Sequence, residues 1–219
     1  MIHNIKYRIL IVDDHELVRK GLRQIINAEN DMQVCGEATN VNQAKKMCKV
    51  LKPDLAIVDI SLPDGNGLDL IKTLLNWQPE LKILVLSMYD DELFAERALN
   101  SGALGYINKQ DSAEKILEAL TRISTGKIYV SSQITERLLK RISPKEPNKN
   151  TSSVSLLSDR EIHVYEQIGN GKKTSEIAKQ LNLSVKTVET YRRNIKNKLK
   201  LTSGIELARS AVLWSLDSH

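Results

Sequence analysis

The stretch YRILIVDDH, Tyr7–His15, decides the fold: an apolar run that ends directly in two carboxylates. The run does not alternate apolar with polar residues, which is typical of a strand buried on both faces of a sheet. The same pattern recurs in LAIVDI, Leu55–Ile60, where the apolar run ends in Asp59. Strands buried on both faces belong to parallel sheets covered by helices on two sides. The two stretches therefore predict an α/β protein.

Working outward from these runs, the first 130 residues alternate short apolar segments with longer amphipathic ones. The expected strands are Tyr7–Val12, Gln33–Glu37, Leu55–Val58, Lys82–Leu86 and Gly105–Ile107. The expected helices lie near Leu17–Asn27, Asn42–Leu51, Leu68–Trp77, Glu92–Ser101 and Ala113–Thr125. Five β/α units predict a doubly wound, five-stranded parallel sheet with the strand order 2-1-3-4-5.

Length and composition bound the class of protein. A chain of 219 residues favours two domains. With 41% hydrophobic and 27% charged residues, and no apolar run near the roughly 20 residues of a membrane span, we expect a cytoplasmic protein without a membrane partner. The two cysteines, Cys35 and Cys48, have no metal-ligand spacing and predict neither a zinc site nor a disulfide scaffold.

The chain changes character after residue 128, so we expect three parts: a domain over 1–128, a helix and flexible linker over 129–155, and a second domain over 156–219. Ser131–Ile142 has an amphipathic helical pattern, and residues 143–153 are rich in proline and small polar residues. Lys and Arg balance Asp and Glu over residues 1–142, 19 to 19, but outnumber them 13 to 8 over 143–219. The whole net charge of +5 therefore lies in the last third, the candidate polyanion-binding region.

Three carboxylates follow expected strands at the point where each strand ends. Asp13 and Asp14 follow the first strand, and Asp59 follows the third. In a parallel sheet of this order, ligands bind beyond the carboxyl ends of strands one and three. Carboxylates brought together there repel one another unless a cation intervenes, and hard oxygen ligands suit Mg²⁺. The sequence therefore predicts a magnesium pocket.

Ser87 and Lys109 stand at the ends of the fourth and fifth expected strands. A hydroxyl and an ammonium beside a metal ion can stabilise a phosphoryl group that gains negative charge in transfer, and an aspartate there can be the nucleophile. Each residue alone has a simpler explanation as a turn former, a helix cap or a surface cation. Five such residues at matching strand ends favour a phosphoryl-transfer site.

These motifs resemble the receiver domain of response regulators, a flavodoxin-like fold, across roughly residues 7–128. The matching stretches are IVDDH at 11–15, VDISLPDGNG at 58–67, LS at 86–87 and GYINK at 105–109. The resemblance implies that Asp59 is the phosphoacceptor and that Lys109 contacts the phosphoryl group. The implied Mg²⁺ ligands are Asp13, Asp14, Asp59 and the backbone carbonyl of Ser61. Ser87 and Tyr106 match the family's switch pair, in which a hydroxyl approaches the phosphoryl group and an aromatic ring turns inward.

The last third predicts four helices over Leu156–Leu216, with a helix-turn-helix at its centre. Ser158 with Glu161 and Ser203 with Glu206 fit capping boxes, and Ser184 is an expected N-cap. A short amphipathic helix over 174–181 is followed by a three-residue turn and a second helix over 185–200. The second helix of such a pair lies in the major groove of DNA, and this one carries six basic residues against one acid. A basic run that is merely solvated is the simpler alternative.

This region resembles the LuxR-type domain of the NarL/FixJ family of response regulators, through LSDRE at 157–161, EIA at 176–178 and KTVETY at 186–191. Tyr191 replaces the histidine more often found there. The residues expected to contact DNA are Lys186, Thr187, Glu189, Thr190, Arg192, Arg193, Lys196 and Lys200. Val188, Ile195 and Leu199 are expected in the core. Glu189 can accept a hydrogen bond from cytosine or pair with Arg193, and we favour the pair.

Together the two resemblances imply a two-component response regulator rather than a turnover enzyme. Its implied partners are a sensor histidine kinase or small phosphodonor, a pseudo-palindromic DNA operator and RNA polymerase. Phosphorylation is expected to promote a homodimer, with Leu207, Ala211 and Trp214 either at the dimer interface or in the core. The alternative is a Mg²⁺-dependent aspartyl-phosphate hydrolase. Such hydrolases place the nucleophile after the first strand, which the position of Asp59 argues against.

Overall fold

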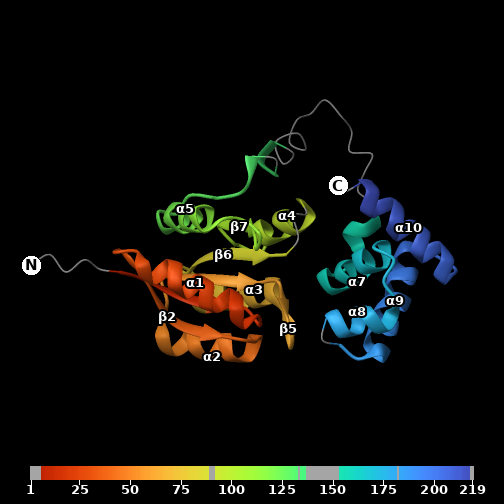
Figure 1. Cartoon of the computed structure of the whole chain (residues 1–219), viewed down its shortest axis with the longest axis horizontal. Helices are drawn as coiled ribbons and strands as arrows, with labels where there is room; N and C mark the ends of the chain where they lie inside the picture. The colour runs from red at the N-terminus through yellow and green to blue at the C-terminus, as the bar shows by residue number, and fades with distance from the viewer. Residues whose placement is uncertain (1–5, 89–91, 133, 137–152, 182, 218–219) are drawn as a thin grey trace, which may run out of the picture. The chain divides into compact units, whose positions relative to one another are not determined.

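The computed structural model describes residues 6–88, 92–132, 134–136, 153–181 and 183–217. The chain falls into two compact units, Met1–Ile142 and Ser143–His219, shown in Figure 1. Within the described residues, none of the helices has the length and apolar character needed to cross a membrane. The expected linker over 143–152 and the second half of the expected helix over 131–142 lie outside the described residues.

The first unit is built on a five-stranded sheet in which each strand pairs in parallel with its neighbours. The strands are β1 Tyr7–Val12, β2 Met32–Ala38, β3 Leu55–Asp59, β6 Lys82–Ser87 and β7 Gly105–Asn108. Their spatial order, β2-β1-β3-β6-β7, confirms the expected order 2-1-3-4-5. Because β1 and β3 are adjacent and parallel, their carboxyl ends meet at one edge, with Val12 opposite Val58.

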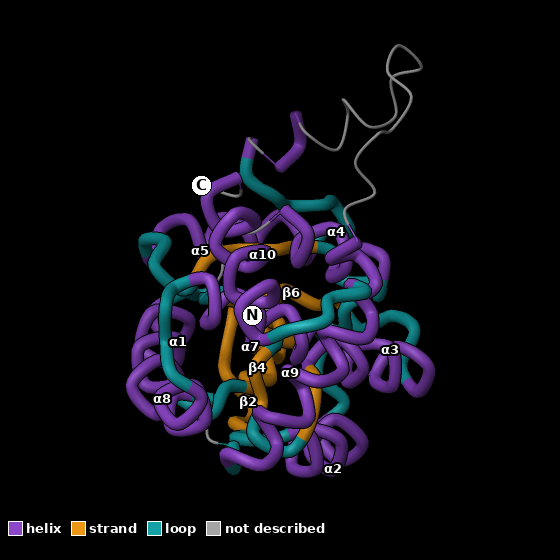
Figure 2. The backbone as a smooth tube through the Cα atoms, turned by 90° about the vertical axis from the view of Figure 1, so that its right-hand side faces the viewer, coloured by secondary structure: helices purple, strands orange, loops and turns teal. Residues whose placement is uncertain are grey.

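Five helices cover the two faces of this sheet. They are α1 Glu16–Ala28, α2 Val41–Leu51, α3 Gly67–Trp77, α4 Glu92–Asn100 and α5 Ala113–Ser124. Alternate strand residues such as Ile9 and Ile57 pack with Ile26 of α1 and Leu120 of α5. In Figure 2, α1 and α5 lie to one side of the strands, and α2 and α3 to the other. Both faces are thus buried, which explains the apolar runs without alternation.

A two-stranded hairpin after β3 was not predicted from the sequence. Its strands, β4 Ser61–Leu62 and β5 Gly65–Asn66, pair antiparallel and lead directly into α3. Here Gly67 passes so close to β3 that an added Cβ atom would lie 2.2 Å from the carbonyl oxygen of Asp59. Only glycine allows this approach, so the hairpin and Gly67 together fix the backbone that follows Asp59.

The second unit is helical, with η1 Ser153–Leu156, α7 Asp159–Gly169, α8 Thr174–Gln180, α9 Val185–Leu199 and α10 Gly204–Asp217. The four expected α-helices are confirmed. Ser158 and Glu161 form the expected capping box, and the Ser184 hydroxyl accepts a hydrogen bond from the Thr187 amide at 3.0 Å. The capping box predicted at Ser203 and Glu206 is formed in part. The Ser203 hydroxyl accepts a hydrogen bond from the Glu206 amide, as in a capping box, but the Glu206 carboxylate accepts its hydrogen bond from the amide of Thr202.

The core of the second unit joins α7, α9 and α10. Val188 and Ile195 of α9 are fully buried, as expected, whereas Leu199 is only half-buried because it lies at the end of the helix. Tyr165 of α7 reaches α10, where its hydroxyl lies 2.6 Å from the Ser210 hydroxyl and its ring packs on Trp214. These contacts hold α9 with its polar face outward.

Replacing Gly67 with Ala should destabilise the first unit by about 1–3 kcal/mol, because the new methyl group meets backbone that no rotamer change can move. Gly21→Ala in α1 is the matched control: nothing lies within 4 Å of its added Cβ, so it should stabilise the unit by about 0.5–1 kcal/mol. Urea unfolding followed by Trp77 fluorescence, in a Trp214→Phe background, measures both. Equal effects would show that the approach to Asp59 is not constrained.

Candidate functional site

The carboxylates at the ends of β1 and β3 come together as predicted. Single ligand atoms of Asp13, Asp14, His15 and Asp59 all lie within 4.8 Å of one another. Asp13 and Asp59 are almost completely buried, whereas Asp14 is partly open to solvent. The Ser61 amide donates to Oδ1 of Asp59 at 3.1 Å, so the hairpin holds that carboxylate in place.

Lys109, which follows β7, joins this cluster from the other side. Its Nζ lies 2.7 Å from Oδ2 of Asp13 and 2.8 Å from Oδ2 of Asp59, and its side chain is only 2% exposed. The Lys109 amide also donates to the carbonyl of Ser87, the last residue of β6. Four strands of the sheet therefore contribute to one buried, charged site.

Burial and charge shift the pKa values of this site. Loss of solvation raises the pKa of the Asp59 carboxyl from 3.8 to about 6; Lys109 opposes the rise, and the charge of Asp13 adds to it. Burial disfavours the charged form of Lys109, but the carboxylates of Asp59 and Asp13 outweigh it and raise the Lys109 pKa. A raised carboxyl pKa stabilises the fold at a pH below the unfolded value, and this contribution is lost as the pH rises through about 6.

The oxygen atoms that face the cluster suit a hard cation. Oδ2 of Asp13 and Oδ1 of Asp14 are buried, and no neutral donor among the described residues hydrogen-bonds to them. Their near neighbours are charged groups instead, Lys109 Nζ at 2.7 Å and His15 Nδ1 at 2.8 Å. Buried carboxylate oxygens without hydrogen bonds are costly unless a positive charge compensates them. The donor set therefore fits Mg²⁺, which prefers carboxylate and carbonyl oxygens.

Sequence reasoning missed two residues that organise the pocket. His15 Nδ1 lies 2.8 Å from Asp14 Oδ1 and 3.1 Å from Asp13 Oδ1. Arg19 of α1 donates from Nη1 to the carbonyl of Asp13 at 2.8 Å, and its Nε lies 3.3 Å from Glu37 of β2. In the sequence, the only indication of these contacts was an arginine four residues, or about one helical turn, after His15. Arg19 thus ties the end of β1 to both α1 and β2.

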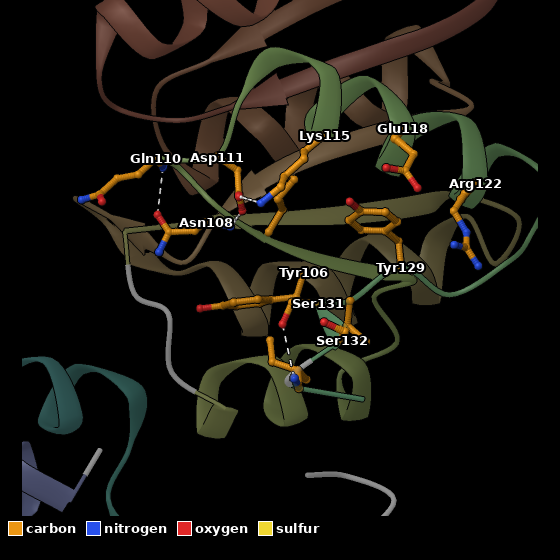
Figure 3. A pocket seen from close by; sticks show the side chains of 13 residues that line it. Tyr106, Asn108, Gln110, Asp111, Lys115, Glu118, Arg122, Tyr129, Ser131 and Ser132 are labelled. Carbon is orange, nitrogen blue, oxygen red and sulfur yellow. Dashed lines mark hydrogen bonds and ion pairs between the residues drawn. The ribbon is translucent and has the colours of Figure 1, made fainter. Parts of the chain in front are cut away.

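The expected switch residues occupy buried positions beside the pocket. Ser87 is 1% exposed and Tyr106 is 2% exposed. A hollow of about 760 Å³ opens next to Tyr106, between β7, α5 and the segment that follows α5, as Figure 3 shows. This hollow does not include the carboxylates of the acidic cluster, so it is a separate feature of the unit.

Helix α9 presents the residues predicted to meet DNA. Lys186, Glu189, Thr190, Arg193 and Lys200 are exposed, while Thr187, Arg192 and Lys196 are half-buried. The expected pair between Glu189 and Arg193 was wrong. Among the described residues, Glu189 pairs with Arg192, whose Nε lies 3.9 Å from Glu189 Oε1, because the three-residue spacing brings these side chains together. Arg193 is thus left exposed without this partner.

The apolar stripe proposed for the last helix faces inward. Leu207 and Ala211 are fully buried, and Trp214 is half-buried with its ring packed on Tyr165, so the three residues pack within the unit. A different face of α10 is exposed and apolar. It carries Ile205, Val212 and Leu213, which are 83%, 41% and 54% exposed.

Two family models match the chain in the same arrangement as its two units. The model for the response regulator receiver domain matches residues 9–121, and that for bacterial regulatory proteins of the luxR family matches 155–211. The fold and its sites thus define a receiver domain followed by a LuxR-type helix-turn-helix domain. The chain belongs to the NarL/FixJ family of response regulators.

Relatives match almost the whole chain. The response regulator GacA of Pseudomonas aeruginosa is 36% identical, over 94% of this chain and 95% of GacA. The response regulator UvrY of Escherichia coli is 33% identical, over 95% of this chain and 94% of UvrY. RcsB of Salmonella enterica serovar Typhimurium, solved bound to the promoter P1flhDC with the phosphomimetic BeF3−, is 27% identical with a TM-score of 0.61. That likeness covers 94% of this chain and 98% of the RcsB chain.

The Asp59 pKa should respond in opposite directions to its two charged neighbours. Without divalent cations, Lys109→Met should raise this pKa above 6, because the ammonium that lowers it is lost. Asp13→Asn should lower it, because a like charge is removed. A pH titration of the Asp59 carboxyl carbon by NMR measures both. Shifts of the same sign would mean that burial alone sets the pKa.

Proposed function

We propose that Asp59 accepts a phosphoryl group and that its phosphorylation controls DNA binding by the second unit. The observation that carries this proposal is the buried Lys109 ammonium, within 2.8 Å of both Asp59 and Asp13 at the strand-end edge. In the step itself, a carboxylate oxygen of Asp59 forms a bond to phosphorus while the bond to the donor's leaving group breaks. That donor is a phosphohistidine of a sensor kinase or a small acyl phosphate.

Each residue of the pocket has a separate role in this step. Asp13, Asp14, Asp59 and the Ser61 carbonyl would hold Mg²⁺, which supplies positive charge to the transferring phosphoryl oxygens. Lys109 keeps Asp59 oriented before transfer and then pairs with a phosphoryl oxygen. The Asp13 carboxylate keeps Lys109 charged throughout, which is consistent with the raised pKa of Lys109.

The response to phosphorylation begins at the two buried switch residues. Ser87 ends β6 and lies opposite Asn108 of β7, so its hydroxyl is carried by a strand next to the one that bears Asp59. We propose that this hydroxyl moves toward the phosphoryl group and that the buried Tyr106 ring turns in response. Slow hydrolysis of the aspartyl phosphate by the protein itself would end the signal.

In the second unit, the proposed DNA surface is the exposed face of α9. The N-terminal part of such a helix meets base edges, and more distal cations meet phosphates. We assign the receiver to residues 1–128, the connection to 129–155 and the DNA-binding domain to 156–219. A pseudo-palindromic operator would bind two copies, and the exposed Ile205, Val212 and Leu213 give α10 an apolar face suited to pairing them. RNA polymerase is a proposed further partner.

Asp59→Asn should abolish Mg²⁺-dependent phosphorylation, because the amide is nearly isosteric but cannot act as a nucleophile. Incubation with acetyl phosphate and intact-mass measurement should show one phosphoryl group on the wild type and none on the variant. Asp54→Asn, an exposed carboxylate of the same unit, is the matched control and should be labelled normally. Chelation of Mg²⁺ should stop labelling of the wild type. Labelling of Asp59→Asn at the wild-type rate contradicts the assignment.

Two cations of α9 should affect DNA binding differently. Lys200→Ala should weaken binding to all sequences alike and lower the salt slope by about 0.9 if Lys200 contacts a phosphate. Arg193→Ala should instead reduce preference for one base pair by roughly 1–3 kcal/mol, because Arg193 is exposed and reads a base edge. Titrations of operator and random DNA at several salt concentrations separate the two. Lys46→Ala in α2 removes the same charge and should change neither.

A further inference from the structure

The segment after α5 returns to the sheet and covers the free edge of β7. We call residues 127–131 the strap. The Tyr129 amide donates to the Leu104 carbonyl, and the Tyr106 amide donates to the Tyr129 carbonyl, both at 2.9 Å. Tyr129 thereby forms a parallel bridge with Gly105. The strap therefore acts as a minimal sixth strand, one residue long in its pairing.

Few backbone hydrogen bonds hold the strap to the edge of the sheet. Within the described residues, two backbone hydrogen bonds join the strap to β7 and to Leu104, the residue before β7. Both bonds involve Tyr129. The next amide of β7 that faces this edge, that of Asn108, bonds to the Asp111 carboxylate instead. On the other side, the Arg122 guanidinium lies 5.9 Å from the centre of the Tyr129 ring. Beside these bonds, the Tyr129 ring packs against the hydrophobic core of the unit.

The strand that carries the strap also ends in the phosphorylation pocket. Tyr106, which donates to the strap, stands three residues before Lys109, whose ammonium binds Asp59 and Asp13. Strap and strand lie close together at Gly105, where an added Cβ atom would lie 3.2 Å from the Tyr129 carbonyl oxygen. A displacement of Lys109 can therefore pass along three residues of the chain to Tyr106 and its hydrogen bond with Tyr129.

Space for the strap to move lies directly beside it. The hollow of about 760 Å³ is bounded by Tyr106, by the charged row of α5 and by residues 129–132 and 134. Figure 3 shows Tyr106 on one side of this space, with Ser131 and Ser132 near it and Tyr129 toward Arg122. Beyond the strap, a helical turn begins where the Thr135 amide donates to the Ser131 carbonyl.

We propose that phosphorylation of Asp59 detaches the strap from β7 and so changes the connection that leads to the DNA-binding unit. The inference rests on the proposed function. When Lys109 exchanges a carboxylate partner for a phosphoryl oxygen, the end of β7 shifts and the Tyr106 ring turns, which strains the two bonds at Tyr129. The strap then leaves the sheet edge, and the hollow receives its side chains.

Hydrogen exchange of single amides, read by NMR on the full chain with Mg²⁺, tests the proposal. On phosphorylation by acetyl phosphate, the amides of Tyr129 and Tyr106 should exchange at least about tenfold faster. The Leu104 amide is the internal control, because it donates to Ile83 of β6 and should keep its rate. Asp59→Asn protein treated identically should show no change at any of the three amides.

The outcomes separate this inference from the function on which it rests. A sample whose mass gains no phosphoryl group contradicts the proposed function itself. A sample that gains the group while Tyr129 exchange stays the same, or slows, overturns the strap proposal alone. Arg122→Ala provides a second measurement: without phosphorylation it should speed Tyr129 exchange about threefold and leave Leu104 unchanged, because it removes the cation beside the Tyr129 ring. No effect at Tyr129 would also count against the proposal.

Discussion

The structure depends on one buried ammonium, Lys109, which lies between the carboxylates of Asp13 and Asp59. Like charges in a dry site repel, so these carboxylates can lie together only with a compensating cation. Lys109 is available because β7 places it at the same edge as β1 and β3. The parallel strand order thus brings these charged groups to one edge of the sheet. Burial of the same strands supplies the stability that keeps the groups there.

Residues around this charged cluster fix the positions of its side chains. Arg19 holds the end of β1, the hairpin amide of Ser61 holds Asp59, and Gly67 lets α3 begin directly beneath them. These contacts use backbone groups, which move less than side chains. A group that approaches Asp59 therefore finds these side chains already held in place. By contrast, within the described residues two backbone hydrogen bonds join the strap to the β7 edge of the sheet, so we expect the strap to move more easily.

The second unit follows a different principle, in which the core orients a charged helix. Val188 and Ile195 face inward and set the rotation of α9, so its basic residues face solvent. Glu189 pairs with Arg192, and Arg193 stays exposed. On α10, Leu207 and Ala211 face the core in the same way, whereas Ile205, Val212 and Leu213 are exposed. The basic side chains of α9 are thereby carried on a helix whose rotation is fixed by the core.

The sequence by itself determined the five β/α units, the helix-turn-helix, most caps and the strand-end positions of Asp13, Asp14 and Asp59, because these follow from local periodicity and from where strands end. Only the tertiary structure decided the two-carboxylate sharing of Lys109, the clamp made by Arg19, the strap at Tyr129 and the inward turn of Leu207, Ala211 and Trp214. The physical reason is that such contacts join residues whose distance depends on register, helix rotation and rotamer. Packing sets these three quantities, and no local pattern encodes them.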